Sequence, residues 1–205
     1  MRLYLDIETA PLPSVGPLVA EWLDDKATDH RLKNPVADPA KRDKAASLNP
    51  WGGRIVAIGF AWGDESPLVL LTETCPESEM LRMWVKDIRR HTPEAIVTYN
   101  GFSFDLPYLR FRLAVYDLLA EAPQWLHLPR YATEQVDWCD RLSCFGRGTM
   151  VGLDVICEAL GVPGPSGHGA DIPAAVAAGD WPTVKAHCLT DVCSLRAIDE
   201  RLGVL

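Results

Sequence analysis

Apolar and polar side chains alternate along residues 3–9, so that Asp6 and Glu8 fall together on the face opposite Leu5 and Ile7. A period of two is typical of a β-strand with one buried face. Two neighbouring carboxylates repel each other unless a cation lies between them, and oxygen ligands suit Mg²⁺ or Mn²⁺. An exposed acidic edge strand would give the same pattern, so this stretch alone leaves both interpretations open.

The pattern beyond this strand predicts a mixture of strands and helices. Residues 54–62 form a near-continuous apolar run, typical of a central strand, and the turn at Gly63-Asp64 indicates a hairpin. A helix between two strands implies a crossover and at least one parallel pair. Residues 121–148 resist assignment, although 135–142 contain a short strand or the start of a helix. The expected strands are 3–9, 54–62, 67–71 and 94–98, and the expected helices are 18–25, 76–91, 105–119, 152–160 and 181–202.

Residues 14 to about 50 look like an insertion between the first two strands. The stretch 31–54 is basic within an acidic chain and has two interpretations of equal weight: a solvated helix surface, or a flap that binds a nucleic-acid strand beside an active site. This basic island contains Arg31, Lys33, Lys41, Arg42, Lys44 and Arg54.

Length and composition restrict the class of protein. The chain has 205 residues, 48% of them hydrophobic and 23% charged, which predicts a single globular domain over residues 1–205. We expect a cytoplasmic protein with no membrane partner, because the sequence shows neither a signal peptide nor a long apolar run. The net charge of −8 argues against a protein that coats long nucleic acids, but an enzyme that grips a few nucleotides is compatible with it.

The six cysteines form no CxxC pair, so we expect reduced thiols. Cys188 and Cys193 flank Asp191, but their spacing fits no zinc pattern.

Two further carboxylates and a histidine are candidates for chemistry. Asp105 follows the strand 94–98 at the start of a predicted helix, where a simple N-cap explains it equally well. Asp191 lies on the last predicted helix, with His187 one turn before it. Four residues along a helix are about 40° out of alignment and about 6 Å apart along the axis, so both side chains can face one site.

Together these residues resemble the three motifs of the DEDD superfamily of 3′–5′ exonucleases. Residues 6–9 (DIET) match DxET, residues 100–105 (NGFSFD) match NxxxxD, and residues 187–191 (HCLTD) occupy the place of YxxxD. The resemblance extends over nearly the whole chain and is strongest to stand-alone exonucleases similar to the proofreading domain of family-B DNA polymerases. The insertion, with LKNPVADPAKRDKAASLNPWGGRIVAIGF, looks like theirs.

The resemblance implies an α/β, ribonuclease-H-like fold with a mixed central sheet flanked by helices. It also implies two divalent ions, Mg²⁺ or Mn²⁺, held by Asp6, Glu8, Asp105 and Asp191, a site suited to phosphodiester hydrolysis. The expected substrate contacts are Thr9, Asn100, Phe102, Phe104 and Tyr108. Core packing explains the three aromatic residues equally well.

His187 departs from the family pattern. It stands at the spacing of the tyrosine subgroup but carries the chemistry of the histidine subgroup. Histidine changes charge near neutral pH, so His187 is a candidate general base; a structural histidine is the alternative.

The sequence therefore predicts a metal-dependent 3′–5′ exonuclease that releases nucleoside 5′-monophosphates, with single-stranded DNA as the expected substrate. An exoribonuclease or oligoribonuclease on the same fold is the first alternative. An inactive nucleic-acid-binding module is the second, although all four carboxylates are present. The expected partners are nucleic-acid 3′ ends, and a replication or repair protein partner remains unidentified.

Overall fold

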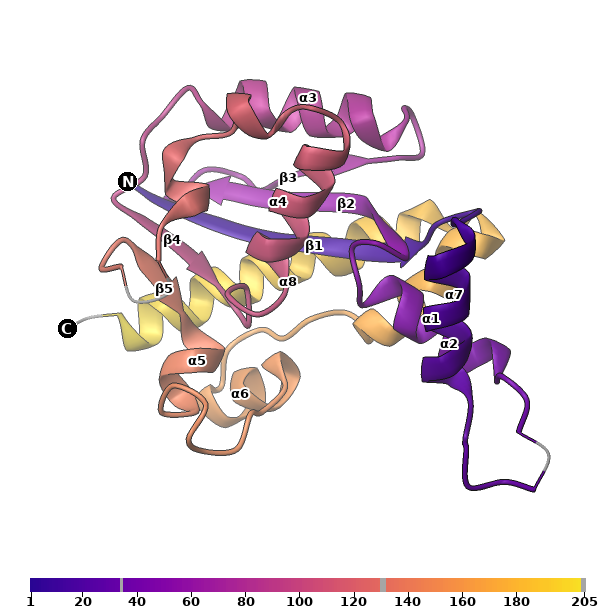
Figure 1. The fold of residues 1–205 in the computed structure, drawn as a ribbon. Coiled ribbons are helices and arrows are strands. Elements are labelled where there is room, and N and C mark those ends of the chain that lie inside the picture. Colours follow the sequence, from indigo (N-terminus) through magenta and orange to yellow (C-terminus); the bar gives the residue numbers. More distant parts are fainter. Residues whose placement is uncertain (34, 130–131, 204–205) are drawn as a thin grey trace.

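In a computed structural model, residues 1–33, 35–129 and 132–203 are described. Asn34 of the insertion and residues 130–131 of the unassigned stretch lie outside them. Five strands form one mixed sheet in the order β3-β2-β1-β4-β5 (Figure 1). The strands are β1 (Arg2–Pro11), β2 (Gly53–Trp62), β3 (Leu68–Leu71), β4 (Ala95–Thr98) and β5 (Gln135–Asp137).

Strand β1 lies in the middle of the sheet. It pairs antiparallel with β2, which pairs antiparallel with β3, and it pairs parallel with β4, which pairs parallel with β5. The prediction of a mixed sheet with a parallel crossover is confirmed. Because β1 has partners on both sides, the interpretation of residues 3–9 as an exposed acidic edge strand is wrong.

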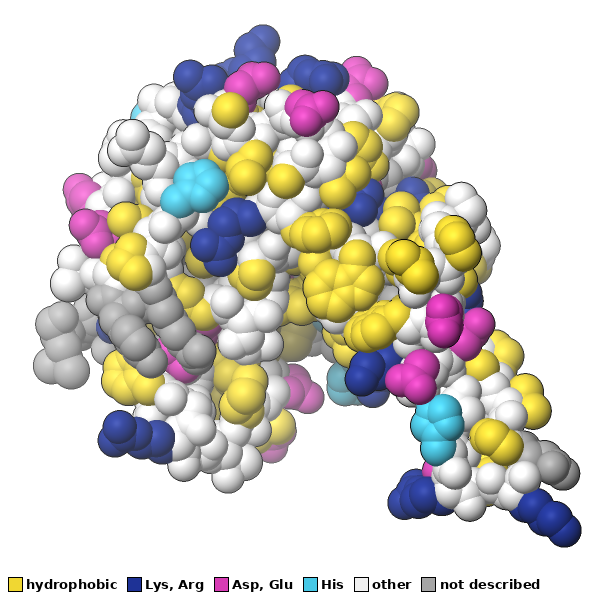
Figure 2. Space-filling model, in the orientation of Figure 1, with side chains coloured by type: hydrophobic (Ala, Val, Ile, Leu, Met, Phe, Trp, Pro, Cys, Tyr) yellow, Lys and Arg dark blue, Asp and Glu magenta, His cyan; other side chains and the backbone are white. Residues whose placement is uncertain are grey.

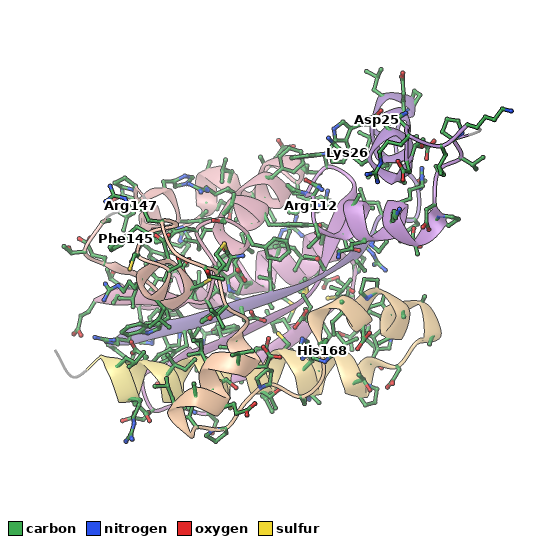
Figure 3. The ribbon with its side chains drawn as sticks, turned by 90° about the horizontal axis from the view of Figure 1, so that it is seen from below. Asp25, Lys26, Arg112, Phe145, Arg147 and His168 are labelled. Atoms are coloured by element: carbon green, nitrogen blue, oxygen red, sulfur yellow. The ribbon has the colours of Figure 1, made fainter. Side chains whose placement is uncertain are left out.

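Helices cover both faces of the sheet. Arg112 of α4 and His168, on the loop before α7, lie on opposite sides of β1 (Figure 3). The face on the side of Arg112 packs against α3 and α4, and the face on the side of His168 packs against α6, α7 and α8. The helices are α1 (Pro17–Ala27), α2 (Pro39–Ser47), α3 (Glu77–Ile88), α4 (Asp105–Val115), α5 (Trp138–Leu142), α6 (Leu153–Leu160), α7 (Ile172–Ala178) and α8 (Trp181–Leu202), with short 3₁₀ turns at Leu119–Glu121, Gln124–His127 and Gly169–Asp171.

Most of the expected elements are present with small differences at their ends. Helix α4 stops at Val115 rather than near residue 119, because the chain turns at Asp117, which has a left-handed backbone with φ 57°. Residues 135–142 contain both alternatives, the strand β5 followed directly by α5. None of the helices in the described part of the chain is long and apolar enough to cross a bilayer.

Helix α7 was not expected from the pattern, and α2 lies within residues 31–54, for which a solvated helix surface was one of the two interpretations. Helix α2 begins at an Asp-Pro pair: the Asp38 carboxylate accepts hydrogen bonds from the N–H groups of Ala40 and Lys41. Helices α1 and α2 project as an arm at one end of the sheet (Figure 1). The molecule is hollowed between this arm and the side that carries α5 and α6 (Figure 2).

A buried ion pair fixes α4 against the sheet. Both oxygens of Glu77 accept hydrogen bonds from the guanidinium of Arg112, from Nε at 2.9 Å and from Nη2 at 2.6 Å. Glu77 also accepts from the backbone N–H of Ile55 and from the hydroxyl of Tyr116. Since the Glu77 and Arg112 side chains are each 4% exposed, this network joins α3, β2 and α4 inside the core.

Breaking this pair should destabilise the protein strongly. Arg112→Met leaves the Glu77 carboxylate buried without its cation, so we expect the free energy of unfolding to fall by roughly 3–5 kcal/mol in urea titrations. The control is the double variant Glu77→Met/Arg112→Met, which removes both charges and should lose less. Equal losses in the two variants would show that the ion pair is not what holds α4.

Candidate active site

The site begins at Asp6 and Glu8, on the face of β1 that α8 covers. Glu8 is 6% exposed. The register between β1 and β2 shifts between Glu8 and Thr9, where one extra residue of β2 makes a bulge. Bulges sharpen the local twist of a strand and often lie beside active sites. The first predicted motif therefore lies on the central strand, where its direction changes.

Asp105 is the first residue of α4 rather than its N-cap. Its Oδ1 accepts a hydrogen bond from the backbone N–H of Ile7 at 3.0 Å, so this carboxylate reaches from α4 across to β1. The turn before α4 starts at Asn100, whose φ is 64°. Asp137, at the end of β5, holds this turn by accepting from the N–H groups of Asn100 at 2.8 Å and Phe102 at 3.0 Å.

His187 and Asp191 face the site from α8. His187 Nδ1 lies 2.8 Å from the carbonyl oxygen of Ser166. Because a carbonyl only accepts, Nδ1 is the donor, and in the neutral ring Nε2 carries the lone pair. Nε2 lies 3.6 Å from Glu8 Oε1, and Nδ1 lies 3.7 Å from Asp191 Oδ1. The free nitrogen of the imidazole is therefore directed toward the first motif.

The loop that binds His187 is itself attached to α8. The backbone N–H of Ser166 donates to Thr190 Oγ1 at 2.9 Å, and this hydroxyl donates to the carbonyl of His187 at 2.9 Å. The tautomer of His187 thus depends on a short loop outside the three motifs and on Thr190, which occupies a variable position of the third motif.

One cavity of about 260 Å³ brings together the residues predicted to bind metal or to act in catalysis. Asn100, Phe104 and His168 line it as well. The predicted set at its wall is Asp6, Glu8, Asp105, His187 and Asp191, which come from β1, α4 and α8.

Burial and mutual repulsion dominate the electrostatics of the cavity. Burial raises the pKa of Asp105 to about 7 and the pKa of Asp191 to about 6, the latter despite the opposing effect of His187. Burial, followed by the charge of Glu8, raises the pKa of Asp6 well above its ordinary value. The pKa of Glu8 rises as well, through burial and then the charge of Asp191. Protein groups alone therefore do not neutralise the four carboxylates.

These residues fit divalent cations. Asp6 Oδ2 and Asp191 Oδ1 are buried, and neither has a hydrogen-bond partner among the described residues. Two groups of side chains bring their ligand atoms within 4.8 Å of one another: Asp6, Glu8 and Cys188 in one, and Glu8, His187 and Asp191 in the other. The donors are mainly carboxylate oxygens, the ligands that Mg²⁺ and Mn²⁺ prefer. Burial raises the pKa of the Cys188 thiol well above its ordinary value, which makes sulfur a poor ligand here.

Of the five expected substrate contacts, two line the cavity and three lie outside its lining. Asn100 and Phe104 line the cavity. Tyr108 is 1% exposed and packs in the core, so its ring offers no face on which a base could stack. The alternative interpretation, core packing, therefore applies to this ring. The hydroxyl of Thr9 donates to the carbonyl of Ser47 on α2. Phe102 is half-buried against the core beside α4.

Sequence reasoning missed three residues that shape the site. Asp137 and Ser166 have been described above. Gly59, opposite Asp6 in the sheet, is the third: a Cβ built there would lie 2.8 Å from Cys188 Sγ and 2.9 Å from Val192. The absence of a side chain at Gly59 lets α8 approach the sheet closely enough for Asp191 to reach the cavity. A glycine within an apolar strand is the signal for such a close approach.

Comparison with protein families decides which family this is. Residues 53–195 match the family described as "Predicted 3'-5' exonuclease related to the exonuclease domain of PolB". The chain belongs to this family. The match includes Asp105, His187 and Asp191, whereas Asp6 and Glu8 precede it.

Curated relatives match over short segments. The chain is 58% identical over 33 residues to a DNA polymerase of Pyrococcus glycovorans and 32% identical over 65 residues to a DNA polymerase of Thermococcus aggregans. These segments cover 16% and 28% of this chain and 4% of each polymerase. The chain thus corresponds to a small part of these relatives.

A solved structure extends the likeness to the whole fold. The family B DNA polymerase from Pyrobaculum calidifontis aligns with a TM-score of 0.65 and 22% identity, over 98% of this chain and 24% of the polymerase. The five-stranded mixed sheet and its flanking helices match the exonuclease domain of that polymerase family. The expected ribonuclease-H-like fold is confirmed.

The crowded carboxylates should make the metal-free protein less stable at high pH. For an acid whose pKa is raised by folding, the stabilising contribution is complete below the unfolded pKa of about 4 and is lost as the pH rises through the folded pKa. For Asp191 and Asp105 this loss falls between pH 4 and about 7. We therefore expect the melting temperature in EDTA to fall over this window.

Asp105→Asn is the matched variant, because its amide oxygen can still accept from the N–H of Ile7. In EDTA at pH 8 this variant should melt several degrees above the wild-type protein, and the difference should shrink at pH 5. Equal melting temperatures for the two proteins at pH 8 would contradict the electrostatic argument.

Proposed function

We propose that this protein is a metal-dependent 3′–5′ exonuclease that hydrolyses the terminal phosphodiester bond of single-stranded DNA and releases nucleoside 5′-monophosphates. The observation that carries the proposal is the convergence of Asp6, Glu8, Asp105 and Asp191 on one cavity, in a chain of the 3′–5′ exonuclease family. Two of these carboxylates have a buried oxygen that accepts no hydrogen bond from the described part of the chain, as expected of metal ligands.

Divalent ions held by the four carboxylates would supply positive charge for the scissile phosphate and the leaving 3′ oxygen. The chain's own residues then position and deprotonate the attacking water. Glu8 accepts a hydrogen bond from the water, and His187 Nε2, 3.6 Å from Glu8 Oε1, takes its proton. The hydrogen bond from Nδ1 to Ser166 keeps the lone pair on Nε2 and the ring in place.

Removing one carboxylate should abolish cleavage without unfolding the protein. Asp6→Asn and Asp105→Asn should each lower kcat by on the order of 10³-fold or more, since each would lose several kcal/mol of charge stabilisation in the transition state. The measurement is the shortening of a 5′-labelled single strand in EDTA, Mg²⁺ and Mn²⁺. Asp171→Asn, an exposed acid outside the cavity lining, is the control and should remain active. Near-normal activity of a folded Asp6→Asn protein would refute the site.

His187 should affect the chemical step more than binding. As a general base it contributes roughly 10²–10⁴-fold, so His187→Ala should lower kcat by this factor and change KM little. His187→Tyr should recover part of the loss, because a hydroxyl at this position can still orient the water. Full kcat in folded His187→Ala would instead make His187 a structural residue.

Substrate class needs a direct comparison. DNA and RNA single strands of identical sequence, labelled at the 5′ end, should be shortened from the 3′ end with the higher kcat/KM for DNA. A preference for RNA would favour the exoribonuclease alternative. Binding of both strands without cleavage in any metal would favour the inactive module.

A further inference from the structure

The catalytic cavity contains two imidazoles, and the mechanism described above uses only one of them. His187 comes from α8, whereas His168 comes from the loop between α6 and α7. His168 belongs to none of the three sequence motifs and lies 19 residues before His187 in the chain. Only the fold brings the two rings to the wall of one cavity (the loop residue is labelled in Figure 3).

The loop that carries His168 is fixed on both sides of this residue. Before it, Ser166 donates its N–H to Thr190 Oγ1 at 2.9 Å and accepts from His187 Nδ1 at 2.8 Å. After it, the N–H of Asp171 donates to the carbonyl of His168 at 2.9 Å. Gly167 has a φ of 84°, a left-handed turn that glycine adopts without strain. The backbone of His168 is therefore held at the cavity rather than free to swing away.

The same loop passes directly beside the free nitrogen of His187. A Cβ built at Gly169 would lie 3.5 Å from His187 Nε2, so the backbone next to His168 borders the nitrogen proposed as the base. The shared cavity has a volume of about 260 Å³. A phosphate group placed in a space of this size touches more than one wall, so it meets both the loop and α8.

Hydrolysis of a phosphodiester moves two protons. The attacking water loses one, for which His187 is the proposed base, and the leaving 3′ oxygen gains one as its bond to phosphorus breaks. An alkoxide is a strong base, so a positioned proton donor lowers the energy of the transition state in which negative charge develops on this oxygen.

Among the described residues that line the cavity, few groups can supply this second proton. None of these residues is a lysine or an arginine. The hydroxyl of Tyr99 donates to the carbonyl of Val151 at 2.7 Å, and Nδ1 of His187 donates to Ser166. His168 is exposed, so solvent can return a proton to it after each turnover. The charged and titratable groups that share the cavity with it are Asp6 and Glu8 of β1, Asp105 of α4, Asp154 of α6, and His187 and Asp191 of α8.

We propose that His168 is the general acid of the reaction. As the bond between phosphorus and the 3′ oxygen breaks, its electron pair goes to that oxygen, which takes a proton from a ring N–H of the His168 imidazolium. The neutral ring then takes a proton from solvent. The inference rests on the proposed function and deepens it, because it assigns the acid and the base to two histidines on different elements.

A sulfur atom in place of the leaving 3′ oxygen tests this role directly. A thiolate is a far weaker base than an alkoxide, so it departs without a proton donor. Two single strands are compared in Mn²⁺, identical except that the last linkage of one has a 3′-bridging sulfur. His168→Gln should lower kcat about 10²-fold or more for the oxygen linkage, and less than about threefold for the sulfur linkage.

Three variants serve as controls. His187→Ala should lose activity on both linkages, because it acts on the water rather than on the leaving group. His127→Gln changes an exposed histidine outside the cavity lining and should cleave both strands normally. Asp154→Asn removes the cavity's remaining carboxylate and should not become selective for sulfur; selectivity in this variant and not in His168→Gln would make Asp154 the acid and overturn the inference.

Strand binding in EDTA, measured by fluorescence anisotropy, gives a readout that needs no turnover. His168→Gln should bind the labelled oxygen-linked strand with the wild-type Kd. A Kd raised tenfold or more would make His168 a phosphate-binding group and overturn the inference. An equal loss of kcat on both linkages, or full activity of His168→Gln on the oxygen linkage, would overturn it as well. A wild-type protein that cleaves neither strand would contradict the proposed function, and the inference would fall with it.

Discussion

Repulsion among four carboxylates, two of them buried and two partly buried, is the constraint on which the rest of this structure depends. Asp6, Glu8, Asp105 and Asp191 share one small cavity, and burial raises the pKa of each. Such an arrangement persists only where the surrounding structure holds the groups together or cations neutralise them. Contacts outside the cavity hold the four groups together. The chemistry proposed for the site depends on cations that neutralise them.

The contacts that hold the site are distributed over several elements. The ion pair of Glu77 and Arg112 fixes α4 against the sheet. Asp105 is the first residue of this helix, and its carboxylate accepts a hydrogen bond from a backbone N–H of β1. At the far end of α8, Asp199 accepts from the hydroxyl of Tyr4 and from Nε1 of Trp138, each at 3.0 Å, which ties this helix to the sheet. The site therefore rests on buried polar groups whose partners lie on other elements, as buried polar groups generally require.

Periodicity and motif spacing were sufficient for the central strand and for α8, because one buried face imposes a period that survives in the sequence. They did not delimit α2, which starts at the capping pair Asp38-Pro39, and they failed for α7, which ends at Gly179 with a left-handed backbone. The motifs named the residues that line the cavity. The groups that position them, such as Asp137 and Ser166, act through tertiary contacts that no local pattern encodes. Tyr108 shows the converse, because its place three residues after the second motif suggested substrate contact, while its burial assigns it to the core.

The most direct test of the account is a crystal structure of the protein soaked in Mn²⁺, with anomalous scattering recorded at the manganese edge. The account predicts peaks in contact with Asp6, Glu8, Asp105 and Asp191, including the buried oxygens Asp6 Oδ2 and Asp191 Oδ1, and loss of those peaks in Asp6→Asn. A well-ordered cavity without anomalous density at millimolar Mn²⁺, or peaks that remain unchanged in Asp6→Asn, would contradict it.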